Sequence, residues 1–242
     1  MEIFGIPIQA MMGQLLIGLI NGSFYALLSL GLAVIFGLLN IINFAHGAQY
    51  MLGAFGAYLL LNKLGLGYWW ALLIVPLVVG ATGVIIERTM LARLYKLDHL
   101  YGLLLTFGLA LIIQGFFRNK YGSTGLPYAV PEQLQGGINL GFMFLPIYRG
   151  WVVVAALTVC FATWFIIEKT KLGAYLRAGT ENPQIVQALG INVPLLITFT
   201  YGYGVALAAF AGVLAAPIYQ VNPLMGSNLI IVVFAVVVIG GM

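Results

Sequence analysis

The stretch LGLGYWWALLIVPLVVGATGVII, residues Leu64 to Ile86, decides the class of fold. It contains no Asp, Glu, Lys or Arg, and Lys63 and Glu87 flank it. A membrane-spanning helix needs about 20 predominantly apolar residues to cross about 30 Å of hydrocarbon. This stretch is therefore long enough and apolar enough to cross a membrane once.

The same pattern recurs along the chain. The other charge-free runs are Ile3–Asn62, His99–Phe117, Gly150–Ile167 and Asn182–Met242. Of the 242 residues, 62% are hydrophobic and only 7% are charged, whereas a soluble domain carries about 25% charged residues. Such a chain lacks the polar groups that a globular surface needs, so the sequence indicates a polytopic membrane protein.

We therefore expect an all-α, polytopic transmembrane helical bundle with about seven spans, forming one domain over residues 1–242. The expected spans are 11–38, 45–62, 69–92, 99–117, 150–168, 196–216 and 228–242. The longest polar connections are the segments 118–149 and 168–195. The one cysteine, Cys160, lies in an apolar run and indicates a small buried side chain rather than a disulfide.

The distribution of basic residues predicts the orientation. Lys and Arg favour the cytoplasmic side of a membrane, and the 87–98 and 168–195 segments outnumber the opposite side by six basic residues to four. The six are Arg88, Arg93, Lys96, Lys169, Lys171 and Arg177. We expect these two segments in the cytoplasm, and three spans counted back from the first of them place the N-terminus outside, in the periplasm.

The sequence lacks the motifs of several kinds of enzyme and metal site. There is no phosphate-binding G-x-x-x-x-G-K-[ST] loop, no H-E-x-x-H or cysteine cluster for a metal, and no G-x-S-x-G nucleophile elbow. The ten Lys and Arg are spread among loop ends, so a nucleic-acid surface is not expected either. We expect a protein that is not an enzyme, binds no metal or cofactor, and takes any energy for uphill transport from another subunit.

The 168–195 segment contains a predicted short helix. Asn182 followed by Pro183 indicates an N-cap and first helical residue, and Gly190 indicates the end. About two turns, on the order of 10 Å, are far too short to cross a membrane. Its predicted apolar face consists of Ile185, Val186 and Leu189. Such a face docks against a partner, or it rests on the lipid interface or on this protein's own helix ends.

Two polar interruptions stand out in the first charge-free run. In NIINFAHG, residues 40–47, the side chains of Asn40, Asn43 and His46 are able to hydrogen-bond backbone groups exposed at a break between helices. In a second interpretation, these side chains line a solute path or its inner gate. Asn21, Ser23 and Tyr25 form the other interruption, predicted to be either a discontinuity that contacts solute near mid-membrane or a set of interhelical hydrogen bonds.

A stripe of small residues marks a close helix contact. It consists of Gly204, Ala208, Gly212 and Ala216. Small residues at every fourth position let membrane helices approach closely. We expect tight structural packing here, with a contact between moving transporter helices as the alternative.

Taken together, these motifs resemble the membrane-embedded permease subunits of branched-chain amino-acid (leucine, isoleucine, valine) ABC importers, of the first of two permease types. The resemblance rests on NGSFYAL at 21–27, NFAHG at 43–47, and ALGIN at 188–192, and it covers nearly the whole chain. Family members run on past the paired glycines Gly240 and Gly241 into at least one further helix, so we expect a truncated permease. The Glu-Ala-Ala signature of many ABC importers is missing, and only Ala188 and Gly190 stand at matching places.

The resemblance implies a division of labour in a bacterial inner membrane. A periplasmic binding protein delivers the solute, this chain and a second permease form the path, and two cytoplasmic ATPases bind the ATP. The short helix becomes the coupling helix, with Asn182, Pro183, Ile185, Val186, Ala188, Leu189 and Gly190 as its residues. Importers of urea and short amides are close relatives of this family. A stand-alone channel or facilitator for a small neutral solute is the alternative from another class.

Overall fold

Helices make up most of the protein, and several are long and apolar. The computed structural model describes residues 2–3, 6–39, 41–95 and 97–240. The main helices are α1 (Ile8–Leu39), α2 (His46–Leu64), α3 (Tyr68–Thr89), α4 (His99–Tyr121), α5 (Ile147–Lys169), α6 (Lys171–Glu181), α7 (Pro183–Ala188), α8 (Val193–Tyr219) and α9 (Ile230–Ile239). This architecture confirms the predicted all-α, polytopic membrane class.

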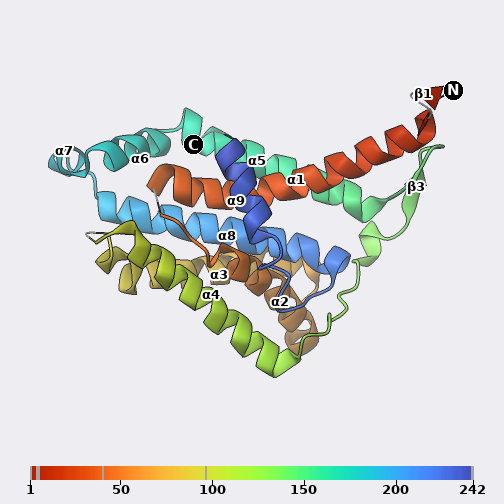
Figure 1. Ribbon diagram of the computed structural model, residues 1–242, viewed down its shortest axis with the longest axis horizontal. Helices are drawn as coiled ribbons and strands as arrows, with labels where there is room; N and C mark the ends of the chain where they lie inside the picture. Colours follow the sequence, from red (N-terminus) through yellow and green to blue (C-terminus); the bar gives the residue numbers. More distant parts are fainter. Residues whose placement is uncertain (1, 4–5, 40, 96, 241–242) are drawn as a thin grey trace.

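Short elements complete the chain. Two single-turn helices, η1 (Leu91–Arg93) and η2 (Glu132–Leu134), lie in connections. Strands β1 (Glu2–Ile3) and β2 (Ile6–Pro7) form one antiparallel pair, and β3 (Gly137–Asn139) and β4 (Phe144–Pro146) form another. Figure 1 shows α7 at one end of the bundle and β3 at the other, so we call these the α7 end and the β3 end.

Helix α8 is the centre of the bundle and lies against α1, α2 and α3 (Figure 1). Its small residues make this possible. A Cβ atom on Gly204 would come within 2.7 Å of the Gly31 carbonyl oxygen of α1, and one on Gly212 would overlap the Tyr50 carbonyl oxygen of α2. Ala208 and Ala216 are buried in the same helix. The predicted stripe therefore lies against two different helices rather than one.

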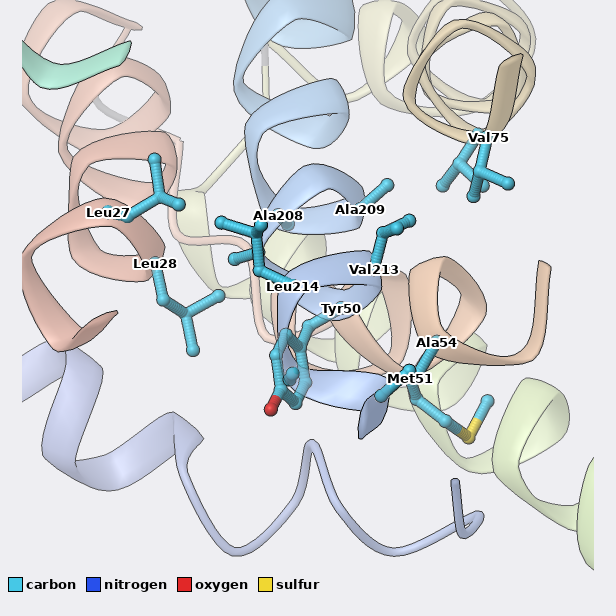
Figure 2. Packing of buried hydrophobic residues seen from close by; sticks show 14 of the residues in the cluster. Leu27, Leu28, Tyr50, Met51, Ala54, Val75, Ala208, Ala209, Val213 and Leu214 are labelled. Atoms are coloured by element: carbon cyan, nitrogen blue, oxygen red, sulfur yellow. The ribbon is translucent and has the colours of Figure 1, made fainter. Parts of the chain in front are cut away.

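The core around α8 is apolar and tightly packed. Figure 2 shows buried side chains of α1, α2 and α3 in the core around α8, among them Leu28, Met51 and Val75. All three are at most 2% exposed, and they belong to a single cluster of buried apolar residues. Close backbone approach through glycine and alanine adds dispersion contacts, which are a main source of helix association where lipid removes the hydrophobic driving force.

Five of the seven expected spans are long, apolar helices. In the described part of the chain, α1, α4, α5, α8 and α3 with its η1 extension are long and apolar enough to cross a membrane. The other two expected spans, α2 and α9, are not among them. Helix α9 has ten residues, about 15 Å in length, which is half of the hydrocarbon thickness. By length and composition, five of the seven expected spans are thus candidate membrane spans, and the count of about seven stays a prediction.

Helix α2 tolerates polar residues because protein surrounds it. From His46 to Ala57 almost all of its residues are buried. By contrast, the lipid-exposed candidates α3, α4 and α5 carry large apolar side chains on their surfaces, such as Leu77, Ile112 and Phe161, each at least 65% exposed. The first three turns of α2 have no lipid face and so no need of continuous hydrophobicity, which accounts for the lower hydropathy of this helix.

Aromatic side chains tie three helices together at the β3 end. The Tyr148 hydroxyl of α5 donates to the Leu214 carbonyl of α8 at 2.9 Å, and it lies 3.1 Å from the Tyr68 hydroxyl of α3. The Trp151 indole N–H donates to the same Tyr68 hydroxyl at 3.0 Å. The ring of Trp69 lies 5.3 Å from that of Trp151. These bonds fix the ends of α3, α5 and α8 relative to one another.

Candidate functional site

The connection between α1 and α2 runs back into the interior of the bundle. Helix α1 ends at Leu39 at the α7 end, and the chain returns to the middle before α2 begins (Figure 1). The imidazole of His46, the first residue of α2, lies 3.0 Å from the carbonyl oxygen of Leu28. Because Leu28 precedes the end of α1 by eleven residues, α2 begins about 16 Å from that end. The sequence predicted this junction where the first long helix ends, near the inner face; in the structure α2 begins beside the middle of α1 rather than beside its end.

Threonine 106 of α4 supports the non-helical backbone of this connection. Its hydroxyl is fully buried, accepts a hydrogen bond from the Phe44 N–H at 3.1 Å, and lies 3.2 Å from the Ile42 carbonyl. Unsatisfied backbone groups are costly at membrane depth, so non-helical backbone occurs there only where protein or a water-filled cavity surrounds it. One side chain here satisfies a backbone donor and reaches a backbone acceptor.

A second non-helical connection enters from the opposite end and meets the first. Residues 220–229 lead from the end of α8, at the β3 end, back to the middle, where α9 begins (Figure 1). A Cβ atom on Gly47 would come within 2.6 Å of the Gly226 carbonyl oxygen, and one on Gly226 would overlap the Gly47 carbonyl. We call this meeting point the central junction: residues 41–47 and 220–229. Discontinuous helices that meet inside a membrane domain are the usual setting of transporter solute sites.

A cavity of about 230 Å³ lies at the central junction. It is lined by Phe24, Tyr25, Tyr50, Tyr219, Asn222, Met225, Asn228 and Leu229; we call it the central chamber. Its lining contains aromatic rings, two amides and no charged side chain. The Tyr50 hydroxyl is buried, has no hydrogen-bond partner in the described part of the chain, and points toward the segment after α8 (Figure 2). The chamber thus offers apolar walls with a few polar groups, as small-molecule sites do.

Buried polar side chains also gather where α2 begins. The Asn43 amide donates to the Gln49 side-chain oxygen at 3.0 Å, and both residues are at most 1% exposed. Within the described residues, Asn43 Oδ1, Gln49 Nε2 and His46 Nδ1 have no hydrogen-bond partner. Each such atom costs about 1–3 kcal/mol. Because buried polar groups are almost always paired, these atoms are available to bond a water or a solute.

The other predicted path residues lie apart from the junction backbone. Ser23 donates to the Ile20 carbonyl of its own helix at 2.8 Å. Helix α1 is continuous through Asn21, Ser23 and Tyr25, so the predicted discontinuity at these residues was wrong. Tyr25 nevertheless lines the central chamber, and Asn21 faces α5 and α8. Asn40 lies outside the described residues.

Replacing His46 with Ala tests which role that side chain has. A carbonyl only accepts hydrogen bonds, so Nε2 carries the proton in its contact with Leu28. The bond joins the start of α2 to the middle of α1. We expect His46→Ala to lower stability by about 1–3 kcal/mol, seen as a lower melting temperature in detergent, with unchanged solute preference. A stable variant with altered solute preference or pH dependence of transport would assign His46 to the gate instead.

The predicted short helix is present at the α7 end. In α7, the Asn182 side chain accepts from the Ile185 N–H at 3.2 Å, Pro183 is the first residue, and Gly190 has a φ of +85° after the end. These features confirm the local prediction. Ile185 and Leu189 are 60% and 75% exposed.

The third residue of the predicted apolar face, Val186, is not exposed. Val186 is 5% exposed and packs against this chain, whereas Ala188 is exposed. Ile185 and Leu189 are therefore the large apolar side chains exposed on α7 and at its end. Burial of Val186 holds α7 against its own protein.

Two features at the α7 end were not predicted from the sequence. The first is helix α6, which precedes α7. A Cβ on Gly173 would overlap the Ile167 carbonyl, so the turn from α5 into α6 requires glycine.

The second feature is the Glu87 carboxylate, which is 2% exposed. It accepts hydrogen bonds from the Tyr95 hydroxyl at 2.7 Å and the Thr198 hydroxyl at 2.6 Å. It joins α3 to the start of α8. Because Glu87 stands at the end of an apolar run, the sequence indicated only a span boundary there.

The central junction and the helices packed around it also contain residues that the sequence analysis did not select as site residues. These are Phe24, Gln49, Tyr50, Thr106, Tyr219, Asn222, Gly226 and Asn228. The Asn-Pro pair at 222–223, which caps its own turn through a bond from the Leu224 N–H at 3.0 Å, was the available signal. The contact between Gly47 and Gly226 joins residues far apart in the sequence, and no local pattern reports it.

Comparisons with known proteins agree on one family. Residues 14–242 match the family described as branched-chain amino acid transport system / permease component. The chain is 31% identical over 245 residues to the high-affinity branched-chain amino acid transport system permease protein BraD of Pseudomonas aeruginosa, covering 94% of this chain and 78% of BraD. It is 28% identical over 242 residues to LivH of Escherichia coli K12, with the same coverage.

A more distant relative belongs to the same kind of system. LivM of Escherichia coli K12, also a high-affinity branched-chain amino acid transport system permease protein, is 27% identical over 216 residues. That match covers 79% of this chain and 50% of LivM. No solved structure gives a significant match.

Proposed function

Because this chain belongs to the branched-chain amino acid transport permease family, we propose that it forms half of the membrane path of an ATP-driven importer of branched-chain amino acids. The observation that carries this proposal is the central junction. Two non-helical connections meet there beside an uncharged chamber. The chain belongs to a family described as a branched-chain amino acid transport permease. The family consists of transporter subunits, not enzymes, and the chain is a multi-pass membrane protein.

The chamber suits a small amphipathic solute. Aliphatic side chains bind in apolar surroundings, and Phe24, Met225 and Leu229 supply such surfaces. The Tyr50 hydroxyl and the Asn222 and Asn228 amides supply hydrogen-bonding groups on other walls. A charged lining would penalise the aliphatic part, and a wholly apolar lining would reject the polar part. The mixture supports a zwitterionic aliphatic solute.

Coupling to an ATPase is proposed through α7. An apolar pair, Ile185 and Leu189, is exposed on a helix otherwise fixed by the buried Val186. Exposed apolar side chains spaced by one helical turn are the anchors that helix-in-groove recognition uses. Nucleotide-driven closure of two ATPases would displace α7, and the packed helices behind it would rock as rigid bodies to change the side that the path faces.

The remaining partners follow from the same assignment. We propose a second permease of the same family as the other half of the path, two cytoplasmic ATPases that bind the ATP, and a periplasmic binding protein that delivers the solute. The membrane is the bacterial inner membrane, with the α7 end in the cytoplasm and the N-terminus in the periplasm, as the basic residues predict. This chain itself needs no cofactor.

Solute uptake tests the substrate class. The full-length permease, with its partner permease, ATPases and binding protein, is reconstituted in proteoliposomes and given radiolabelled leucine, valine or urea. We expect ATP-dependent accumulation of leucine and valine. Accumulation of urea alone would assign the protein to the urea and amide importers, and downhill passage of solute through this subunit alone would make it a facilitator.

A further inference from the structure

Arg149 is a half-buried cation without a counter-charge in the structure. It lies in the first turn of α5, at the β3 end. Among the described residues the single ion pair joins Arg177 and Glu168, and the Arg149 guanidinium donates no hydrogen bond. The first turn of α5 contains no acidic residue. A cation at a helix N-terminus is also unfavourable, because the helix dipole is positive there. Both features leave the Arg149 guanidinium free to bind an anionic group.

The surroundings of Arg149 form a small cavity next to the central chamber. The cavity has a volume of about 20 Å³ and is lined by Ile20, Asn21, Phe24, Arg149, Val152, Ile218 and Tyr219. Its volume is enough for about one water-sized group. Asn21 is half-buried here, and no described residue hydrogen-bonds its side-chain amide. An unpaired amide and an unpaired guanidinium therefore face the same space.

Two aromatic residues separate this cavity from the central chamber. Phe24 and Tyr219 line both, and their rings lie 5.7 Å apart. Phe24 is buried, whereas Tyr219 is 46% exposed and is the last residue of α8, so its side chain has room to change rotamer. Such a change would join the two spaces into one site with an apolar chamber and a cationic end.

We propose that Arg149 and Asn21 bind the α-carboxylate of the transported amino acid as it enters the central chamber. This inference rests on the proposed function. A guanidinium binds a carboxylate through two parallel hydrogen bonds, and the Asn21 amide is able to donate another. The aliphatic side chain then lies on the Phe24 side, within the chamber. This arrangement selects amino acids over urea and neutral amides, which have no carboxylate for the cation.

Three variants and a matched control test the proposal in the reconstituted full-length complex. Leucine uptake is measured against the concentration of leucine-loaded binding protein, in liposomes of phosphatidylethanolamine and phosphatidylglycerol and in liposomes of phosphatidylcholine alone. Arg149→Gln removes the cation, and Arg149→Lys keeps the charge without the planar fork. Asn21→Asp places a carboxylate where it would pair with Arg149. Arg118→Gln removes another cation of the β3 end, which is exposed and bonds Ser123 instead.

We expect Arg149→Gln and Asn21→Asp to lower maximal uptake by about 10- to 100-fold, the range for a lost charge-assisted hydrogen bond. The KM for loaded binding protein should stay unchanged in both lipid mixtures. Arg149→Lys should lose less, and Arg118→Gln should match the wild type. Asn21→Asp guards against misfolding as an explanation, because a new ion pair with Arg149 would stabilise the fold while blocking uptake.

Other outcomes overturn the inference. Wild-type uptake by Arg149→Gln would remove the carboxylate site while leaving the proposed function intact. A raised KM with unchanged maximal uptake would place an acidic group of the binding protein on Arg149. A loss confined to liposomes with phosphatidylglycerol would assign the anion to a lipid phosphate. If the wild-type complex accumulates urea and not leucine, the proposed function fails together with the carboxylate site.

Discussion

The Leu189→Asp variant is expected to lose solute uptake by at least 100-fold while its membrane domain stays folded. Leu189 is 75% exposed at the end of α7 and contributes nothing to the core, so its replacement leaves the fold unchanged. In the proposed complex it lies in an ATPase groove, where an unpaired carboxylate costs several kcal/mol. The measurement is leucine uptake together with recovery of the ATPases when the permease is purified by affinity tag.

Gln187→Asp is the matched control for this variant. It introduces the same charge on the same helix, at an exposed position that lies on the other side from Ile185 and Leu189. We expect it to keep more than half of the wild-type uptake. If Leu189→Asp recovers its ATPases and transports like the wild type, α7 is not the coupling helix.

The Gly212→Ala variant is expected to destabilise the bundle more than any other single-methyl change in α8. The added Cβ would overlap the Tyr50 carbonyl oxygen, and it would lie 2.9 Å from the Ala54 nitrogen. Backbone atoms are unable to rotate away as a side chain does, so α2 and α8 must separate. Overpacking costs about 1–3 kcal/mol or more, which lowers the melting temperature of a protein of this size by about 6–12 °C at the upper end.

Gly37→Ala provides the comparison in α1. No heavy atom lies within 4 Å of the Cβ position there, and alanine favours a helix over glycine by about 1 kcal/mol. We expect an unchanged or slightly higher melting temperature in detergent. Equal melting temperatures for Gly212→Ala and Gly37→Ala would mean that α2 and α8 are not in backbone contact.

Local sequence signals predicted the features that depend on neighbouring residues. The apolar runs located the long helices, since crossing a membrane requires about 20 apolar residues in succession. Asn182, Pro183 and Gly190 located α7, because capping depends on the residues at the helix ends themselves. Motif resemblance then predicted the family, which the comparisons show.

The features that depend on contacts between residues far apart in the sequence could not be predicted from local patterns. The depth of His46 depends on its bond to Leu28 and on the contact between Gly47 and Gly226, and neither pair is close in sequence. Because Asn21, Ser23 and Tyr25 are polar, they suggested a break, yet Ser23 bonds within the helix and α1 continues. Val186 belongs to an apolar triplet, but tertiary packing decides which member of such a triplet is buried.

The most direct test of the account is ATP hydrolysis by the full-length permease reconstituted with its partner permease, ATPases and binding protein. The binding protein is added empty or loaded with leucine, valine or urea. The account predicts that the leucine- and valine-loaded forms stimulate hydrolysis above the empty form, and that Leu189→Asp removes this stimulation. Hydrolysis that responds to the urea-loaded form alone, or to no loaded form, would contradict it.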